Sequence, residues 1–142
     1  MRNLYDDVYF RRGYVVFEDN TTLWWLRLLK KGFRHCYVLI KLRGGRNSWL
    51  EINPLSNQLV VCEHYSSSEE DYLIRLCRRQ NCRVIAANFV QAPPKCAPLG
   101  VFSCVEFVKR IVGIHCFGII TPYQLYKKLK KSQNCRKKVL TS

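Results

Sequence analysis

The sequence predicts an α+β fold in which a central antiparallel sheet packs against helices. Two features carry this prediction. The first is a β-hairpin in which segments 33–42 and 48–53, both rich in β-branched and aromatic residues, flank the turn at Gly44-Gly45. The second is an amphipathic helix over residues 104–112. With 142 residues, 48% of them hydrophobic, the chain is long enough for one core and too short for two comfortable ones.

Turn residues and capping residues divide the rest of the chain into further elements. The segments predicted as strands are 14–17, 33–42, 48–53, 58–62 and 83–87. The segments predicted as helices are 23–31, a segment with an acidic start at 66–71 that runs to Cys77, 104–112 and 123–131. We expect the paired tryptophans of 23–31 to pack on the sheet. The chain is thus one domain over 1–142, with its core at about 14–131 and a basic tail at 132–142.

The helix at 104–112 begins with a cysteine. Ser103 fits the N-cap position and forms a capping-box pattern with Glu106, while Gly113 ends the helix. The apolar stripe runs through positions 104, 105, 108, 111 and 112, so Cys104 is expected to be half buried in the first turn. The charged residues expected on the opposite face are Glu106, Lys109 and Arg110. The positive end of the helix dipole favours a thiolate at Cys104, although for a lone cysteine a small apolar residue at a helix start is the commoner explanation of such a position.

A nucleophilic cysteine needs a base, and the chain contains three histidines. His64 follows the strand at 58–62, and His115 lies just past the helix that begins with Cys104. His35 is the preferred candidate, because a strand holds its imidazole in place beside a second strand. A turn centred on Gly44-Gly45 places position 35 opposite position 54 and next to Asn53, which can orient the histidine ring.

These residues resemble a known constellation. The segments that carry the likeness are 32–37 (GFRHCY), 49–54 (WLEINP) and 103–108 (SCVEFV). A histidine that opens a central strand, a polar residue on the next strand and a later cysteine at a helix start are similar to the circularly permuted branch of the papain-like, NlpC-like superfamily. That branch includes relatives similar to lecithin:retinol acyltransferases. The resemblance spans roughly residues 14–131.

The resemblance implies a papain-like (permuted NlpC-like) fold and a role for each residue of the site. Cys104 would be the nucleophile, His35 the general base and Asn53 the orienting residue, with Glu51 in reserve because it shares a face with Asn53. The superfamily's glutamine ahead of the cysteine has no counterpart at 98–100, which leaves the second oxyanion donor unassigned and a non-catalytic member open.

The first hypothesis for function is a thiol hydrolase that acts on amide bonds through a Cys-His-polar triad. It would be a cysteine peptidase, an amidase or an acyltransferase, with a peptide, peptidoglycan or other acyl compound as substrate. No metal or organic cofactor is implied. The spacing of Cys62 with His64 and of Cys77 with Cys82 lacks the paired pattern of a zinc site.

The alternative hypothesis rests on charge. The net charge is +14, and Lys and Arg are concentrated at 127–138. A non-catalytic module that binds nucleic acid weakly, or another acidic partner, through this basic end explains the excess, as does a solvated helix face. The opening of the sequence shows neither a signal peptide nor an apolar span, and we therefore expect a cytoplasmic protein whose eight cysteines are reduced thiols.

Overall fold

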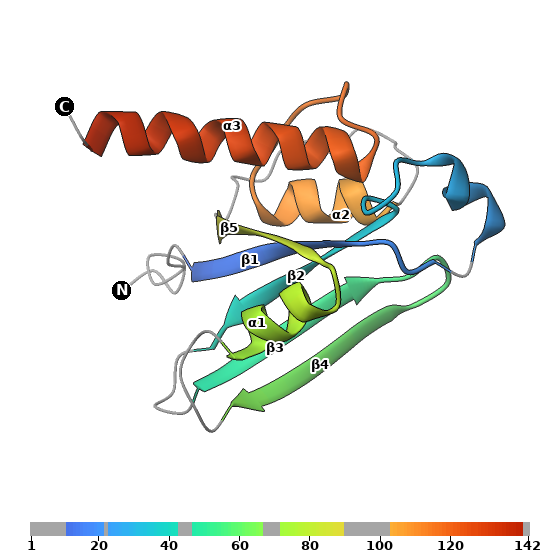
Figure 1. The fold of residues 1–142 in the computed structure, drawn as a ribbon, viewed down its shortest axis with the longest axis horizontal. Helices are drawn as coiled ribbons and strands as arrows, with labels where there is room; N and C mark the ends of the chain where they lie inside the picture. The colour runs from blue at the N-terminus through green and yellow to red at the C-terminus, as the bar shows by residue number, and fades with distance from the viewer. Residues whose placement is uncertain (1–10, 22, 43–46, 67–71, 90–102, 141–142) are drawn as a thin grey trace, which may run out of the picture.

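The computed structural model describes residues 11–21, 23–42, 47–66, 72–89 and 103–140, and it has an α+β architecture built on a five-stranded antiparallel sheet (Figure 1). The strand order is β4-β3-β2-β1-β5. The strands are β1 (Arg11–Glu18), β2 (His35–Lys41), β3 (Asn47–Pro54), β4 (Leu59–Ser66) and β5 (Arg83–Phe89). The helices are the 3₁₀ helix η1 (Trp24–Leu28), α1 (Tyr72–Arg79), α2 (Cys104–Ile111) and α3 (Pro122–Leu140). The predicted fold class is confirmed at this level.

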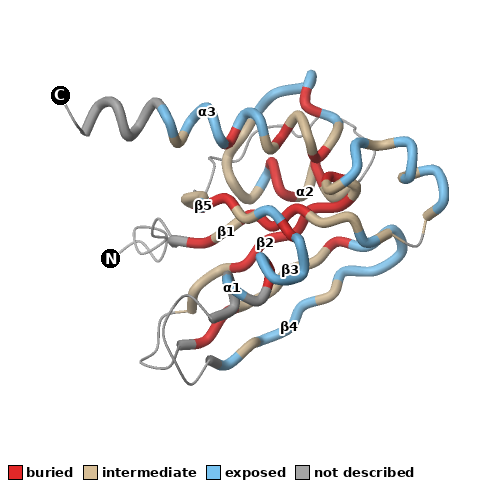
Figure 2. The backbone as a smooth tube through the Cα atoms, viewed as in Figure 1, coloured by how far each residue is buried: buried red, intermediate tan, exposed pale blue. Residues whose placement is uncertain are grey.

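Helices pack on both faces of the sheet. The larger core joins alternate residues of β1, β2 and β5 to α2 and α3, with Phe17, Val38, Val105, Val108 and Leu125 among its buried members. A smaller cluster on the opposite face brings together Val16, Leu39 and Trp49 with Cys77 of α1 and Cys82. Figure 2 shows the result: buried backbone runs through β1 and β2, whereas much of the edge strand β4 is exposed.

The segment between β1 and β2 differs from the prediction. Residues 23–31 do not form an α-helix; only the short 3₁₀ helix η1 is helical. Its N-cap residue, Leu23, makes no capping hydrogen bond with its side chain. Thr21 accepts a hydrogen bond from the Leu23 N–H at 3.1 Å, which makes a local turn instead. The prediction that the tryptophans pack on the sheet is wrong, since Trp24 and Trp25 are both exposed.

Two strand predictions need correction. In the observed register Val38 lies opposite Ile52 and Leu39 opposite Glu51, one residue away from the predicted pairing. Because side chains alternate between faces, this single step changes which residues share a face. The strand predicted at 58–62 continues to Ser66, so His64 lies inside β4 and not after it. The turn at Gly44-Gly45, which the prediction used to set the register, lies outside the described residues.

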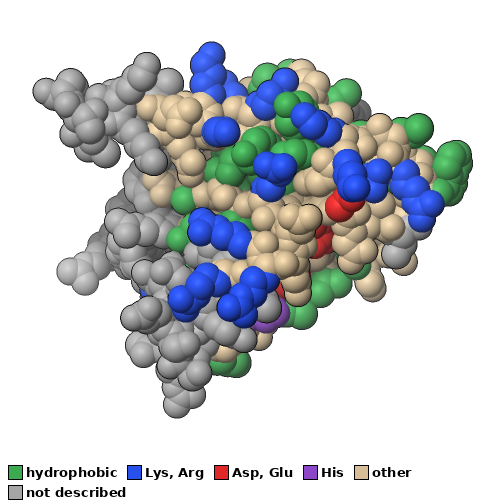
Figure 3. All heavy atoms as spheres, viewed as in Figure 1, with side chains coloured by type: hydrophobic (Ala, Val, Ile, Leu, Met, Phe, Trp, Pro, Cys, Tyr) green, Lys and Arg blue, Asp and Glu red, His purple; other side chains and the backbone are tan. Residues whose placement is uncertain are grey.

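The last helix is longer than predicted. It continues past residue 131 to Leu140, so positions 132–140, expected to belong to a tail, are helical. On this helix Lys127, Lys128, Lys130 and Lys131 are exposed. Figure 3 shows Lys and Arg spread over one face of the molecule, with far fewer carboxylates among them. Residues 67–71 of the predicted acidic helix start lie outside the described residues.

Candidate functional site

Cys104 is the first residue of α2, as the sequence predicts, and it is partly exposed. The Ser103 hydroxyl accepts a hydrogen bond from the Glu106 N–H at 3.2 Å, which confirms the predicted N-cap. Gly113 has a positive φ of 70°, a conformation that glycine adopts without strain and that ends the helix. The N–H groups of Cys104 and Val105 have no carbonyl partner within the helix, so Cys104 lies at the positive end of α2.

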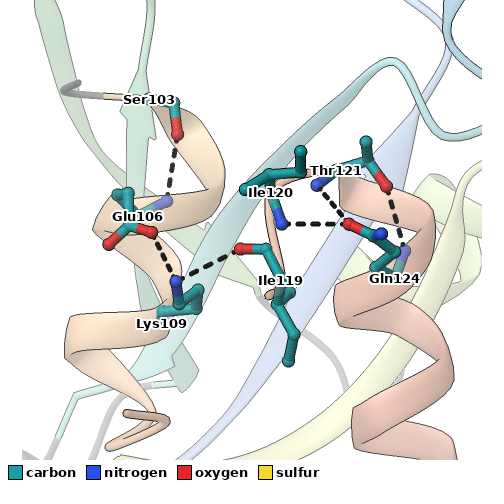
Figure 4. Close-up of polar contacts among 7 residues, drawn as sticks. All are labelled: Ser103, Glu106, Lys109, Ile119, Ile120, Thr121 and Gln124. Atoms are coloured by element: carbon teal, nitrogen blue, oxygen red, sulfur yellow. Dashed lines mark hydrogen bonds and ion pairs between the residues drawn. The ribbon is translucent and has the colours of Figure 1, made fainter. Parts of the chain in front are cut away.

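A buried lysine in the last turn of α2 also stabilises this helix. Lys109, expected on the solvent face, is only 4% exposed. Its Nζ donates to the Glu106 carboxylate and to the Ile119 carbonyl, the latter at 3.2 Å (Figure 4). In the structure the Glu106 carboxylate thus pairs with Lys109. These contacts tie α2 to the segment ahead of α3 and fix the position of Cys104.

A reciprocal capping box lies at the start of α3. Gln124 Oε1 accepts the N–H groups of Ile120 and Thr121, both at 3.0 Å, and Thr121 Oγ1 accepts the Gln124 N–H at 3.3 Å (Figure 4). Pro122 occupies the first helical position. Because Ile119 directly precedes this cap, the rigid start of α3 supports the Lys109 contact that holds α2.

His35 opens β2, and Asn53 lies near the end of β3. The observed register puts His35 on the same face as Asn53, as diagonal neighbours, whereas the predicted register would have placed them on opposite faces. The His35 Nε2 lies 2.7 Å from the Asn53 Oδ1. The pairing of His35 with Asn53 is therefore present, although the register from which it was predicted is wrong.

Glu51 makes no hydrogen bond with His35; it accepts a hydrogen bond from the amide nitrogen of Asn53. The Asn53 Nδ2 donates to Glu51 Oε1 at 3.2 Å, and the second Glu51 oxygen lies 2.8 Å from the His64 Nε2. A carboxylate only accepts hydrogen bonds, so the amide nitrogen must face Glu51 and the amide oxygen must face His35. The Asn53 oxygen in turn requires a proton on the His35 Nε2, which leaves Nδ1 for Cys104.

The Cys104 sulfur is hydrogen bonded to the side chains of both Cys36 and His35. The bond from the Cys36 thiol lowers the pKa of Cys104 most, burial opposes it, and the His35 hydrogen bond and charge lower it further, to about 5. Burial raises the pKa of Cys36 well above its ordinary value, so Cys36 stays protonated and donates. These interactions favour the thiolate form of Cys104.

His35 is buried and its pKa is raised. Burial lowers this pKa, but the hydrogen bonds with Cys104 and Asn53 and the negative charges of Cys104 and Glu18 outweigh it. Glu18 is the residue directly opposite His35 in the β1–β2 register. Burial raises the pKa of Glu18, and the His35 charge opposes this. The site therefore favours an imidazolium beside a thiolate.

Sequence reasoning missed Cys36, Glu18 and His64. Cys36 directly follows His35 on the strand, and alternation turns its side chain to the face that carries α2. His64 could have been placed in the site by extending the strand predicted at 58–62, an extension that the alternating pattern of the sequence permits. His115, the remaining histidine, is exposed.

Metal groups and membrane-spanning helices were sought in the part of the chain that the structure describes. No three side chains of His, Cys, Asp or Glu are grouped there in a way that could hold a metal ion. No described helix combines the length and the apolar character that crossing a bilayer requires. The chain has no match among protein-family models, curated proteins or solved structures.

Proposed function

We propose that this protein is a cysteine hydrolase or acyltransferase that cleaves an amide or ester bond through Cys104, His35 and Asn53. One arrangement carries the proposal: Cys104 at the start of α2 interacts with the His35 imidazole, and Asn53 orients that imidazole. This is the arrangement that nucleophilic catalysis by cysteine needs. The proposal includes a permuted papain-like fold, in which the histidine strand precedes the cysteine helix.

The chemistry follows from the charges of the pair. The Cys104 thiolate attacks the carbonyl carbon of the substrate and forms a thioester, and the His35 imidazolium gives its proton to the leaving amine or alcohol as the bond to it breaks. His35 then accepts a proton from water, or from another acceptor, whose oxygen attacks the thioester and releases the acyl group. The thiolate and imidazolium are restored at the end of the cycle.

The negative oxygen that forms during attack needs hydrogen-bond donors. The backbone N–H groups in the first turn of α2 have no carbonyl partner within the helix and point toward the side of Cys104. Donors of this kind stabilise the oxyanion in acyl transfer. They make the first turn of α2 both the source of the nucleophile and part of its oxyanion site.

Trapping of the acyl group tests this proposal. The full chain is mixed with an activated ester such as p-nitrophenyl acetate, quenched in acid, digested and examined by mass spectrometry. We expect an acetyl group on the peptide that contains Cys104 and on no other cysteine peptide. The Cys62→Ala variant, which removes an exposed thiol away from His35, is the matched control and should behave like the wild type. Equal acetylation of several cysteines would contradict the proposal.

A second candidate function rests on the exposed lysines of α3. Lys127, Lys128, Lys130 and Lys131 suit a nucleic acid or another acidic partner, which would not require Cys104. Binding of random DNA that weakens steeply with added salt, and that is lost when these four lysines are changed to glutamine, would support it. An absence of DNA binding at low salt would exclude it.

A further inference from the structure

The 3₁₀ helix η1 exposes its large apolar side chains. Trp24 is 76% exposed, Trp25 52% and Leu28 87%, and none of the five residues of η1 is buried. In Figure 1 this helical turn projects at the right of the molecule, and Figure 2 shows the same segment as exposed. Large apolar side chains that gather on a projecting segment indicate a contact with another apolar phase.

Polar contacts hold the backbone of this loop, so its apolar side chains are not needed to shape it. Asp19 accepts the Gly32 N–H at 2.8 Å and pairs with Arg34 at 3.2 Å. Arg34 also donates to the Arg27 carbonyl at 3.3 Å. The base of the loop is thereby closed by Asp19 and Arg34, while its tip presents Trp24, Trp25 and Leu28 outward.

Cations surround the apolar tip. Arg27, Lys30 and Lys31 are exposed, and Lys30 lies over the ring of Tyr123 at 3.7 Å, which joins the loop to α3. Asp19 is the carboxylate that contacts the loop in the described residues, and Arg34 neutralises it. At the right edge of Figure 3, where η1 lies in Figure 1, hydrophobic side chains stand beside Lys and Arg.

We propose that η1 inserts into the surface of a bilayer that contains anionic lipids. Tryptophan favours the headgroup region, Leu28 would reach the acyl boundary, and the cations would meet anionic headgroups. A second copy of the chain fits less well, because a symmetric contact would bring the same cations together. A nucleic acid would stack on the two tryptophans but gain nothing from Leu28, the most exposed of the three.

The loop lies at the same end of the sheet as the candidate site, since Arg34 directly precedes His35. A protein seated through η1 would therefore hold Cys104 near the bilayer surface, where the ester or amide bonds of amphiphilic molecules are found. This last step rests on the proposed function; the binding of η1 to the bilayer does not.

Binding to vesicles tests the proposal directly. The full chain is sedimented with vesicles of phosphatidylcholine and phosphatidylglycerol, with pure phosphatidylcholine vesicles for comparison. We expect binding to the anionic vesicles, weaker binding in high salt, and a loss of roughly tenfold or more in the Trp24→Ala/Trp25→Ala/Leu28→Ala variant, because three apolar side chains lose their burial. This variant keeps the net charge, so attraction by the basic helix α3 stays the same.

Two controls sharpen the result. The Leu59→Ala/Val61→Ala/Tyr65→Ala variant removes exposed apolar side chains from β4 and should bind vesicles as the wild type does. Vesicles should shift the tryptophan emission of the wild type to the blue, but not that of Trp24→Phe/Trp25→Phe, which keeps only the buried Trp49.

Undiminished vesicle binding by the η1 variant would overturn the proposal. The proposal would also be overturned if the wild type bound no vesicles and the same substitutions converted a dimer into a monomer. A blue shift with single-stranded DNA in place of vesicles would overturn it as well. Alkylation of Cys104 by iodoacetamide, measured on the same variants without vesicles, reports on the candidate site separately. The failure of one proposal is thereby distinguished from the failure of the other.

Discussion

Two helix ends of this protein carry a buried or half-buried cysteine, and their thiols have opposite character. Cys104 begins α2 and its pKa is lowered to about 5, whereas Cys77 lies in the last turn of α1 and its pKa is raised. Both have a hydrogen-bonding neighbour: for Cys77 it is the Tyr37 hydroxyl, at 3.8 Å. Nearby, burial raises the pKa of Cys82 to about 11.

The difference shows that burial alone makes a cysteine inert and that its partners decide whether it becomes a thiolate. A helix N-terminus presents N–H groups and a positive dipole end, while the C-terminus presents carbonyls and a negative end. Cys104 adds the Cys36 thiol and the His35 imidazolium as donors. For Cys77 the hydrogen bond with the Tyr37 hydroxyl does not outweigh burial. The predictions below test this contrast.

The largest effect is expected from removal of the proposed nucleophile. The Cys104→Ala variant should hydrolyse p-nitrophenyl acetate about 10⁴-fold or more slowly than the wild type, because the proposed acyl intermediate forms on Cys104. The Cys77→Ala variant at the other helix end should keep the full rate. Rates measured on both purified proteins decide this, and a comparable loss in the two variants would remove the distinction.

Loss of the imidazole should come next. In His35→Ala, hydrolysis should fall by about 10²–10⁴-fold, since both the proton donor and the charge that stabilises the thiolate are lost. The matched change on the α1 side, Tyr37→Phe, removes the partner of Cys77 and should leave the reactivity of Cys104 unaffected. Alkylation by iodoacetamide, followed peptide by peptide, measures both.

The pH dependence of alkylation should separate Cys104 from Cys82, the buried cysteine that follows α1. The pKa of Cys104 is about 5, and only the thiolate reacts. The alkylation rate of Cys104 should therefore increase as the pH is raised through about 5, and it should be near its plateau at pH 7. Cys82, with a pKa of about 11, should react only in alkaline solution. A Cys104 rate that still rises steeply between pH 7 and pH 9 would mean that the thiol is ordinary.

Substitutions of Asn53, Glu51 and His64, which orient the His35 ring, should reduce the hydrolysis rate by intermediate factors. Asn53→Ala removes a hydrogen bond to a charged imidazole, for which we expect a loss of about 10- to 100-fold in hydrolysis. Glu51→Gln and His64→Ala leave that bond in place but free the amide to turn, and should each cost about 2- to 10-fold. A loss in Glu51→Gln that equals the loss in Asn53→Ala would show that Glu51 acts more directly than the geometry indicates.

The smallest expected effect on the hydrolysis rate at pH 7 concerns Cys36, although its thiol is the partner that lowers the pKa of Cys104 most. In Cys36→Ala the Cys104 thiolate loses one donor, so the pKa of Cys104 should rise by about one unit, with the site otherwise intact. Absorbance of the thiolate near 240 nm, titrated with Cys104→Ala as the blank, measures the shift. An unchanged pKa would assign the stabilisation to His35 and the helix start alone.

Local sequence predicted much of the site. Ser103, Cys104 and Gly113 lie within a few residues of one another, and capping depends on that short spacing, so the start and end of α2 could be foreseen. The strand that begins with His35 and the strand that carries Asn53 were also recognised by their composition. Longer-range features were misjudged: the extent of β4 and α3, the burial of Lys109, and the exposure of Trp24 and Trp25.

The sequence by itself determined that a cysteine opens a capped helix and that a histidine and an asparagine lie on paired strands. Only the tertiary structure decided that one step of register places His35 and Asn53 on the same face of the sheet. It also decided that Cys36 contacts the Cys104 sulfur from the opposite face, and that Glu51, paired with His64, orients the Asn53 amide. The physical reason is that side chains alternate along a strand by a local rule, whereas the pairing of two strands depends on the turn and on packing against α2, which no local pattern contains.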